Sequence, residues 1–495
     1  MNIFSFWWSG LNITKLSRYF TFFLLTLCLY LVFIVLFSRN SADNDLWGYL
    51  SFGRIFWEEG YFPYHDIFSY TPTKPLWVYH EWLTSVIFYF IYKYTGPAGL
   101  QLLRYVITIL TIYLMYLTAI TKGANSIFAL IVLLPATLLI SFGYVPVRAQ
   151  IFTYFFFMLT IFVLEIAIKD KKWCLLWLMI PIQILWCNFH GGFLAGLGLI
   201  FLYALGQALS QKKFLPLVVI LFVSAFATLI NPYGFEYWIY TFHAVTMPRP
   251  DIQEWMSVFA AWKNQYQNVP VIIFISCFVI YILFFILYRK WNITELLVVC
   301  VIAYLGFAHV RHTIFFGLIF GAFLPVILLQ LWNNWQEEKK FFTRWQYLPQ
   351  ALLMIIFLIF LVKPLAPLSI KPSFSILATS PYYPVGAINW IIKNNISGNI
   401  LPEFDWGEFI IWWGYPACRV AMDGRYETVY KEEVSKAYFD FLQGRDSWRQ
   451  YLLKYPHDMV LLKTNSGIYR LMLTEPLWQV AYADSVCTLF RKKSI

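Results

Sequence analysis

Apolar stretches of about twenty residues, the length that spans a bilayer as a helix, recur along most of this chain and are separated by short polar turns. The run from Trp82 to Tyr94 is an exception. It is only about 13 residues long and carries Lys93, so we expect it to lie at the membrane interface without crossing. The pattern predicts about eleven membrane-spanning helices, at 19–37, 99–120, 126–143, 150–168, 173–189, 193–210, 214–231, 270–288, 294–310, 313–332 and 348–363.

From Pro381 onward the apolar runs are short, and many alternate with polar residues, which is typical of a soluble domain. We therefore divide the chain into a transmembrane module at 1–370 and an α/β domain at 381–495. Cys418 and Cys487 lie in this domain and could pair, although no motif supports a disulfide. The expected strands are 399–403, 418–422, 458–463 and 485–490, and the expected helices are 431–443 and 447–454.

Composition supports the membrane assignment and excludes an ordinary soluble protein. Hydrophobic residues make up 60% of the chain and charged residues only 13%, about half of the charged fraction in a typical soluble domain. The formal net charge of +11 does not indicate nucleic-acid binding, because the Lys and Arg residues lie between apolar runs and form no dense basic arm. We therefore expect the lipid bilayer as a partner and no nucleic acid. The fold class is an all-α polytopic membrane protein with a small C-terminal α/β domain.

The basic residues predict how the helices are oriented in the membrane. With a cytoplasmic N-terminus, every basic turn falls on the cytoplasmic side, as the positive-inside rule requires. The loop at 38–81 and the whole segment after Lys363 then lie outside the cytoplasmic (inner) membrane. If Trp82–Tyr94 also crossed, the most basic turn would fall outside. The basic turns are at Lys122, 169–172, 212–213, 289–290 and 337–344.

Polar side chains with reactive chemistry are concentrated on the predicted outer face, beginning with two acids after the first helix. Asp43 and Asp45 lie where a carboxylate can meet both water and the lipid headgroup layer, which suits a base acting between a lipid and an aqueous substrate. The apolar residues between Leu46 and Glu59 have a spacing close to that of a helix lying in the interface. Both acids would also suit the N-terminal cap of that helix, so catalytic and structural roles stay open.

Short motifs spread over nearly the whole chain form a set. The first outer loop contains Asp-x-Trp at 45–47, GRIFWEEGYFPYHDIFSYT at 53–71 and HEW at 80–82. The other motifs are VRAQIFTY at 147–154, WCNFHGGFLAG at 186–196, LINPYG at 229–234, EW at 254–255, HVRHTIFF at 309–316, FDWGEFIIWW at 404–413 and MDGRYETVY at 422–430. This set resembles the GT-C superfamily of membrane glycosyltransferases, in particular a bacterial branch related to aminoarabinose and protein O-mannosyl transferases.

The resemblance implies a reaction and a division of roles. Such enzymes take a sugar from a polyprenyl-phosphate carrier and invert it onto an acceptor, which here would be a glycan, lipid or protein of the cell envelope. By this resemblance Asp45 is the candidate base, with Asp43 or Glu81 as a second acid. A carboxylate in a partly desolvated loop is chemically suited to accept the proton of an acceptor hydroxyl.

Cationic and titratable side chains at the outer ends of spanning helices supply a candidate site for the donor phosphate. Arginine and histidine are costly at such positions unless they are paired or functional, and a lipid phosphate needs fixed cations at membrane depth. Any one of them could instead snorkel or hydrogen-bond between helices. The candidates are His80, Arg148, His190, Arg311 and His312.

The long loop at 232–269 adds Asp251 and Glu254, which could bind an acceptor or only solvate the loop. No spacing of His, Asp or Glu resembles a metal cage, so we expect no metal and no cofactor, although a divalent ion at Asp43 and Asp45 stays possible. No nucleotide-phosphate loop is found, which argues against a nucleotide-sugar donor. The alternative is a non-catalytic transporter, flippase or scaffold for lipid-linked glycans.

Overall fold

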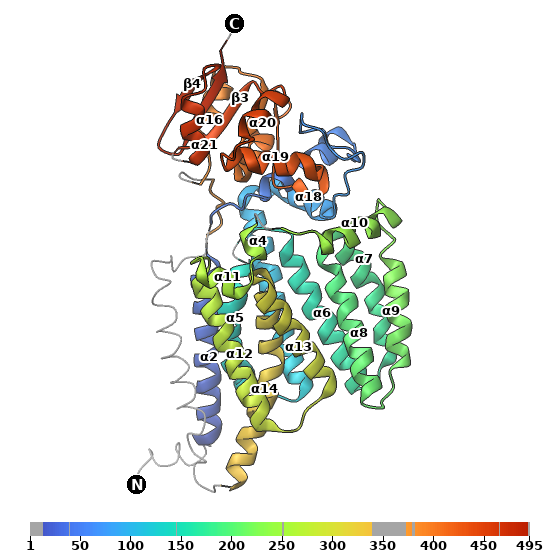
Figure 1. Ribbon diagram of the computed structural model, residues 1–495. Coiled ribbons are helices and arrows are strands. Elements are labelled where there is room, and N and C mark those ends of the chain that lie inside the picture. Colours follow the sequence, from blue (N-terminus) through green and yellow to red (C-terminus); the bar gives the residue numbers. More distant parts are fainter. Residues whose placement is uncertain are drawn as a thin grey trace, which may run out of the picture.

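The structure, a computed structural model, consists of a bundle of helices with a smaller mixed α/β domain at one end (Figure 1). It describes residues 13–38, 40–144, 146–249, 252–338, 373–378, 382–464 and 466–493. The predicted fold class, an all-α polytopic membrane protein with a small C-terminal α/β domain, is confirmed.

The bundle helices follow the apolar runs of the sequence. Within the described residues, 7 helices are long and apolar enough to cross a membrane, and the shorter apolar helices Trp173–Phe189, Leu215–Ala227 and Ile293–Ala308 lie among them. Every predicted span inside the described ranges falls on one of these helices, whereas the span predicted at 348–363 lies outside them. The bundle helices are α2 (Ile13–Phe37), α4 (Trp82–Lys122), α5 (Ser126–Tyr144), α6 (Gln150–Lys169), η2 (Trp173–Leu178) with α7 (Met179–Phe189), η3 (Gly191–Phe193) with α8 (Leu194–Leu209), α9 (Leu215–Ala227), α12 (Asn268–Tyr288), α13 (Ile293–Ala308) and α14 (Thr313–Glu338).

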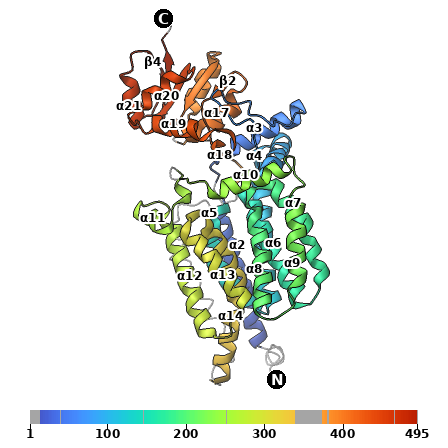
Figure 2. The ribbon, with the colours of Figure 1, turned by 45° about the vertical axis from the view of Figure 1, so that its right-hand side comes forward.

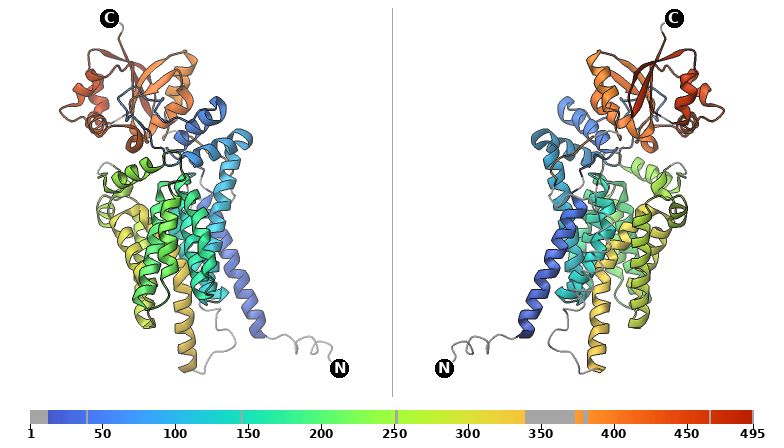
Figure 3. Two further views of the ribbon diagram at one scale, coloured as in Figure 1. Left: turned by 90° about the vertical axis from the view of Figure 1, so that its right-hand side faces the viewer. Right: turned by 90° about the vertical axis from the view of Figure 1, so that its left-hand side faces the viewer.

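Helix α4 is broken near its beginning. Gly96 adopts φ 64° and ψ −158°, a conformation that glycine tolerates because it lacks a Cβ atom, and Pro97 follows it. The chain changes direction at this point, at the end of the bundle that carries the α/β domain (Figure 3). The predicted interfacial run Trp82–Tyr94 therefore forms a separate arm, and the predicted span at 99–120 forms the rest of α4.

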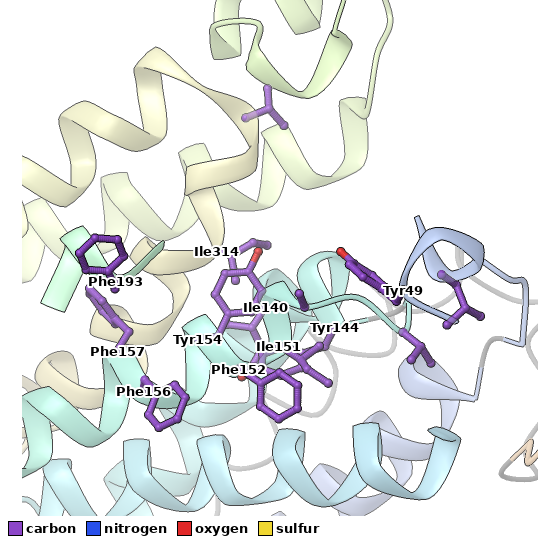
Figure 4. Close-up of a cluster of buried hydrophobic side chains, with 14 of the residues drawn as sticks. Tyr49, Ile140, Tyr144, Ile151, Phe152, Tyr154, Phe156, Phe157, Phe193 and Ile314 are labelled. Carbon is purple, nitrogen blue, oxygen red and sulfur yellow. The ribbon is translucent and has the colours of Figure 1, made fainter. Parts of the chain in front are cut away.

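Helix α5 lies at the centre of the bundle, because α2, α4 and α14 all pack against it. Of the residues in its most apolar stretch, 83% are buried inside the protein, compared with 33% for the corresponding stretch of α2. Toward the end that carries the α/β domain, buried aromatic and branched side chains of α5, α6 and α14 form an apolar floor (Figure 4). These side chains include Ile140, Tyr144, Ile151, Phe152, Tyr154 and Ile314.

At the opposite end of the bundle, a largely buried lysine joins three helices. Lys122 Nζ lies 3.3 Å from Glu165 Oε1 and 3.1 Å from Glu295 Oε2, so the end of α4, the last turns of α6 and the start of α13 meet. Tyr203 and Tyr281 donate hydrogen bonds to the same two glutamates, at 2.7 and 2.8 Å. The described basic turns at Lys122, 169–172, 212–213 and 289–290 all lie at the end of the bundle away from the α/β domain (Figure 1). Most of the basic turn at 337–344 lies outside the described residues.

The C-terminal domain contains a five-stranded sheet in the order β2-β1-β3-β5-β4. Strand β1 (Gly398–Pro402) runs parallel to β2 (Cys418–Val420) and β3 (Met459–Lys463), while β5 (Cys487–Lys492) is antiparallel to β3 and β4 (Trp478–Ala483). The four predicted strands are present, and both predicted helices correspond to α19 (Glu432–Leu442) and α20 (Trp448–Lys454). The sequence pattern did not predict β4 or the helices α16 (Val385–Lys393), α17 (Gly407–Gly414), α18 (Tyr426–Val429) and α21 (Gly467–Leu473). Cys418 and Cys487 are both buried and form no disulfide.

Candidate functional site

The loop at 38–81 lies between the bundle and the C-terminal domain (Figure 2). It contains α3 (Leu46–Arg54) and a π-helical turn, η1 (Ile55–Glu59), where the sequence predicted one helix in the membrane interface. That prediction is wrong about exposure, because α3 is buried from Leu46 to Gly53 against α4 and α17. Small residues permit this: a Cβ atom at Gly53 would lie 2.3 Å from the Ser85 carbonyl oxygen.

Arg148, in the short turn between α5 and α6, is the centre of the charged cluster. Its guanidinium group forms an ion pair with Asp45, and its Nε lies 3.2 Å from Asp43 Oδ1. A third carboxylate, that of Glu254, lies 3.5 Å from the same guanidinium group. One arginine thus holds three acids from two loops that are about two hundred residues apart in the sequence.

Glu254 also contacts the second arginine of the predicted anion site. Its Oε1 lies 3.1 Å from Arg311, which precedes α14, so the carboxylate bridges Arg148 and Arg311. The Arg311 guanidinium group stacks over Trp255, 4.7 Å from the ring centre. His312 is also beside Trp255, and its Nδ1 is buried without a hydrogen-bond partner among the residues that the structure describes.

Glu81, at the start of α4, contacts two histidines. His190 Nδ1 accepts the Gly192 amide hydrogen at 2.8 Å, so the neutral ring carries its proton on Nε2, which lies 3.4 Å from Glu81 Oε1. Thr153 Oγ1 is also 2.8 Å from Nδ1 and holds the ring in place. His80 Nε2 lies 3.9 Å from the same carboxylate oxygen, and burial lowers the pKa of His80 to about 4.

The carboxylates differ in their protonation. Burial and the neighbouring Asp45 raise the pKa of Glu81 to about 8. Burial likewise raises the pKa of Asp43 to about 7, although Arg148 opposes this shift. Burial also acts on Glu254, but the two arginines outweigh it and hold its pKa below 4.5. The two arginines of the cluster are therefore already paired with carboxylates before any substrate is bound.

A cavity of about 60 Å³ opens beside the two arginines. Arg148, Arg311 and Glu254 line it together with Gln150 and Gln267, and apolar side chains of α5, α12 and α14 complete its wall. Gln150 Oε1 is buried and has no hydrogen-bond partner among the described residues. The cavity has room for several water molecules and joins the charged cluster to the spanning helices.

Asp43, Asp45 and Glu254 also form an oxygen-rich set, which is the chemistry that divalent cations such as Mg²⁺ prefer. In the part of the chain that the structure describes, however, no group of three acids, histidines or cysteines has the arrangement of a metal site. Arg148 lies within reach of all three carboxylates, so a cation would have to replace its guanidinium group.

The structure brings nearly all the predicted site residues to one end of the bundle, while Asp251 lies outside the described residues. Sequence reasoning missed the residues by which the C-terminal domain joins this end. Arg249 binds Glu427, with Nη2 and Oε2 2.7 Å apart, and Arg425 binds Asp66 at 2.7 Å and Asp423 at 2.6 Å. The motif MDGRYETVY contains three of these residues, but the sequence alone assigned them no role.

Glu408 was missed as well. It lies in the motif FDWGEFIIWW, is only 5% exposed, and accepts a hydrogen bond from the Gly48 amide of the loop at 38–81. The signal available in the sequence was a single acid within an otherwise apolar segment, which indicates a carboxyl group with a specific partner. Its partner lies 360 residues away in the sequence, which no local pattern could show.

Comparisons with protein-family models and with curated proteins find no match, whereas solved structures resemble the whole architecture. The apo oligosaccharyltransferase of Archaeoglobus fulgidus is 9% identical at a TM-score of 0.61, over 90% of this chain and 70% of that one. AglB from the same organism, solved with an inhibitory peptide and a dolichol-phosphate, is 11% identical at 0.50, over 90% and 69%. ArnT from Cupriavidus metallidurans, solved with undecaprenyl phosphate, is 13% identical at 0.53, over 94% and 97%. The chain therefore has the fold of the GT-C membrane glycosyltransferases.

Proposed function

We propose that this protein transfers a glycosyl unit from a polyprenyl-phosphate-linked sugar to an envelope acceptor on the outer face of the cytoplasmic membrane. The observation that carries the proposal is the pairing of Arg148 and Arg311 beside one cavity, with candidate catalytic carboxylates around them. Solved proteins of the same fold hold undecaprenyl phosphate or a dolichol-phosphate, which supports a lipid-phosphate donor here.

The phosphate would bind where Glu254 now bridges the two arginines. Two guanidinium groups suit a phosphate, because each can offer paired N–H donors to its oxygens. The bound phosphate brings negative charge into a cluster whose arginines are already paired with carboxylates. It therefore displaces at least one carboxylate from Arg148 or Arg311, and Glu254 shares both of them.

In the proposed reaction the acceptor hydroxyl oxygen bonds to the anomeric carbon while the bond from that carbon to the phosphate oxygen breaks. Asp45 accepts the hydroxyl proton, and the phosphate leaves with its negative charge between the arginines. Attack from the face opposite the phosphate inverts the anomeric centre. When the phosphate engages Arg148, the Asp45 carboxylate loses its partner and becomes available to the acceptor hydroxyl.

Glu81 has a different role in this scheme. Because burial raises its pKa to about 8, it is mostly protonated at neutral pH and donates a hydrogen bond instead of accepting a proton. Asp43 accepts the Asp45 backbone amide at 3.2 Å and approaches Arg148, so it orients both groups of the proposed base and anion site.

The test is sugar transfer by the purified full chain with a panel of polyprenyl-phosphate sugars, with and without a chelator. Asp45→Asn should lower the rate by about 10²–10⁴-fold, whereas Glu81→Gln keeps a hydrogen-bond donor and should lose far less at neutral pH. Asp405→Asn is the matched control, because Asp405 pairs with Lys463 on the surface of the C-terminal domain. If Asp45→Asn transfers sugar at the wild-type rate, Asp45 is not the base. Absence of transfer by the wild type with every donor would favour the transporter alternative.

A further inference from the structure

Asp45 occupies the N-cap position of α3, yet its side chain does not cap the helix. The first amides of a helix have no acceptor inside it, and an aspartate at the N-cap position usually supplies its own carboxylate to one of them. The Asp45 side chain forms no capping hydrogen bond in this structure and is paired with Arg148 instead. The backbone amide of Gly48, the third residue of α3, therefore needs another acceptor.

That acceptor comes from the C-terminal domain. Glu408, in the first turn of α17, accepts the Gly48 amide hydrogen through Oε2 at 3.0 Å. The amide at this position is one of the two that an N-cap aspartate normally binds. A side chain distant in sequence thus takes over the capping role that the sequence offers to Asp45.

The space around the Glu408 carboxyl group is shaped by two glycines. A Cβ atom at Gly48 would lie 2.3 Å from Oε2, and one at Gly424 would lie 2.8 Å from Oε1. The same point at Gly424 is 3.4 Å from Asp45 Oδ1. Only residues without a side chain admit the Glu408 carboxyl group here, and they place it beside the Asp45 carboxylate.

We propose that Glu408 is a positioning residue of the candidate catalytic site, which caps α3 in place of Asp45 and so leaves the Asp45 carboxylate to Arg148 and the acceptor. The catalytic consequence rests on the proposed function, whereas the capping itself does not. The C-terminal domain in this proposal supplies part of the catalytic geometry and is more than an attached binding module.

The charges around Glu408 are compatible with this role. Burial, Asp45 and Asp423 raise the pKa of Glu408 above its ordinary value, against the opposing effect of Arg425. A neutral carboxyl group still accepts the Gly48 amide through its carbonyl oxygen, and it does not repel Asp45. Glutamine has nearly the same shape and also carries a carbonyl oxygen that can accept the Gly48 amide hydrogen. Glu408→Gln should therefore keep the cap of α3.

The first experiment is independent of activity: hydrogen exchange of the purified full chain, followed on peptides that cover α3. Glu408→Ala should increase exchange of the first turn of α3 by about tenfold or more, because the Gly48 amide loses its acceptor, and Glu408→Gln should not. Glu403→Ala is the matched control, since Glu403 is similarly buried but accepts the Lys463 amide within the C-terminal domain. Unchanged exchange in Glu408→Ala, or an equal increase in Glu403→Ala, would overturn the proposal.

The second experiment uses sugar transfer. Glu408→Ala should lower kcat by about 10–10²-fold with little change in the donor KM, because the displaced base loses alignment, and Glu408→Gln should restore it. In an Asp45→Asn background the same alanine change should cost little more, as expected for groups that act together. Equal losses in Gln and Ala variants, or full additivity with Asp45→Asn, would refute a positioning role. If the wild type transfers no sugar, the proposed function fails, and hydrogen exchange alone decides the capping.

Discussion

Replacing Glu81 by glutamine should make the protein more stable at alkaline pH. The Glu81 side chain is 13% exposed and lies beside two histidines, and burial raises its pKa to about 8 from an ordinary 4.5. The folded protein therefore holds a proton that the unfolded chain releases above about pH 4.5. Stability falls as the pH rises from there to about 8, where the folded state must also ionise this group.

The size of the effect follows from the pKa difference. The interval between 4.5 and about 8 corresponds to about 5 kcal/mol of lost stability once Glu81 is ionised in both states. Glutamine has no such proton, so the stability advantage of Glu81→Gln should grow by this order between about pH 5 and about pH 9.

The assay is thermal unfolding of wild type and Glu81→Gln in the same detergent at both pH values, with sugar transfer measured in parallel. At acidic pH the two proteins should unfold at similar temperatures, and at alkaline pH the variant should unfold at the higher one. In transfer, the wild type should lose activity as the pH passes about 8, and the variant should not share this decline. A stability difference that does not change with pH would show that the carboxyl group is not held protonated, and the reasoning would fail.

Three further predictions concern other parts of the molecule. Arg311→Ala should raise the donor KM, and Lys should restore it only partly because the planar fork is lost; an unchanged KM would make Arg311 a structural anchor for Glu254. Lys122→Met should lower the free energy of unfolding in detergent by about 3–5 kcal/mol, since it leaves two largely buried glutamates without their cation. Adding Glu165→Gln and Glu295→Gln should recover most of this loss, and a stable single variant would contradict the prediction. The topology is tested by single cysteines in a chain without its native ones. A cysteine that replaces Leu453, a residue 67% exposed, should react with an impermeant label on intact cells, and one that replaces Lys171 should not. The reverse pattern would show that the predicted topology is inverted.

Local pattern was sufficient for the bundle. Helices such as α5 and α12 coincide with uninterrupted apolar runs of the sequence, and a basic turn flanks one end of each. The length of the runs and the positions of the charges therefore predicted where these helices lie. The alternation of the helices also predicted that residues far apart in sequence would meet at one end. The arrangement around Arg148 agrees with that expectation, because it joins acids from two different loops.

The contacts between the C-terminal domain and the loop at 38–81 could not be predicted in this way, because the contacting residues are far apart in the sequence. Helix α17 has only 8 residues, and apart from Glu408 they are apolar or glycine, so they show no helical alternation. Strand β4 was missed because only one of its side chains is buried. The sequence pattern also could not decide whether Asp45 caps α3 or pairs with an arginine. That choice depends on Glu408, which only the tertiary structure brings to Gly48.

The β2 edge of the C-terminal sheet is covered by the loop at 38–81. Strand β2 exchanges backbone hydrogen bonds with it, from Tyr70 to Val420 at 3.2 Å and from Val420 to Phe68 at 3.0 Å. Arg425 takes its second acid, Asp66, from the same loop. A chimera that exchanged only residues 382–493 with a relative would leave a strand edge open and a buried arginine short of one acid. The exchangeable unit therefore consists of two separate segments of the gene, and recombination that preserves function must move the loop and the domain together.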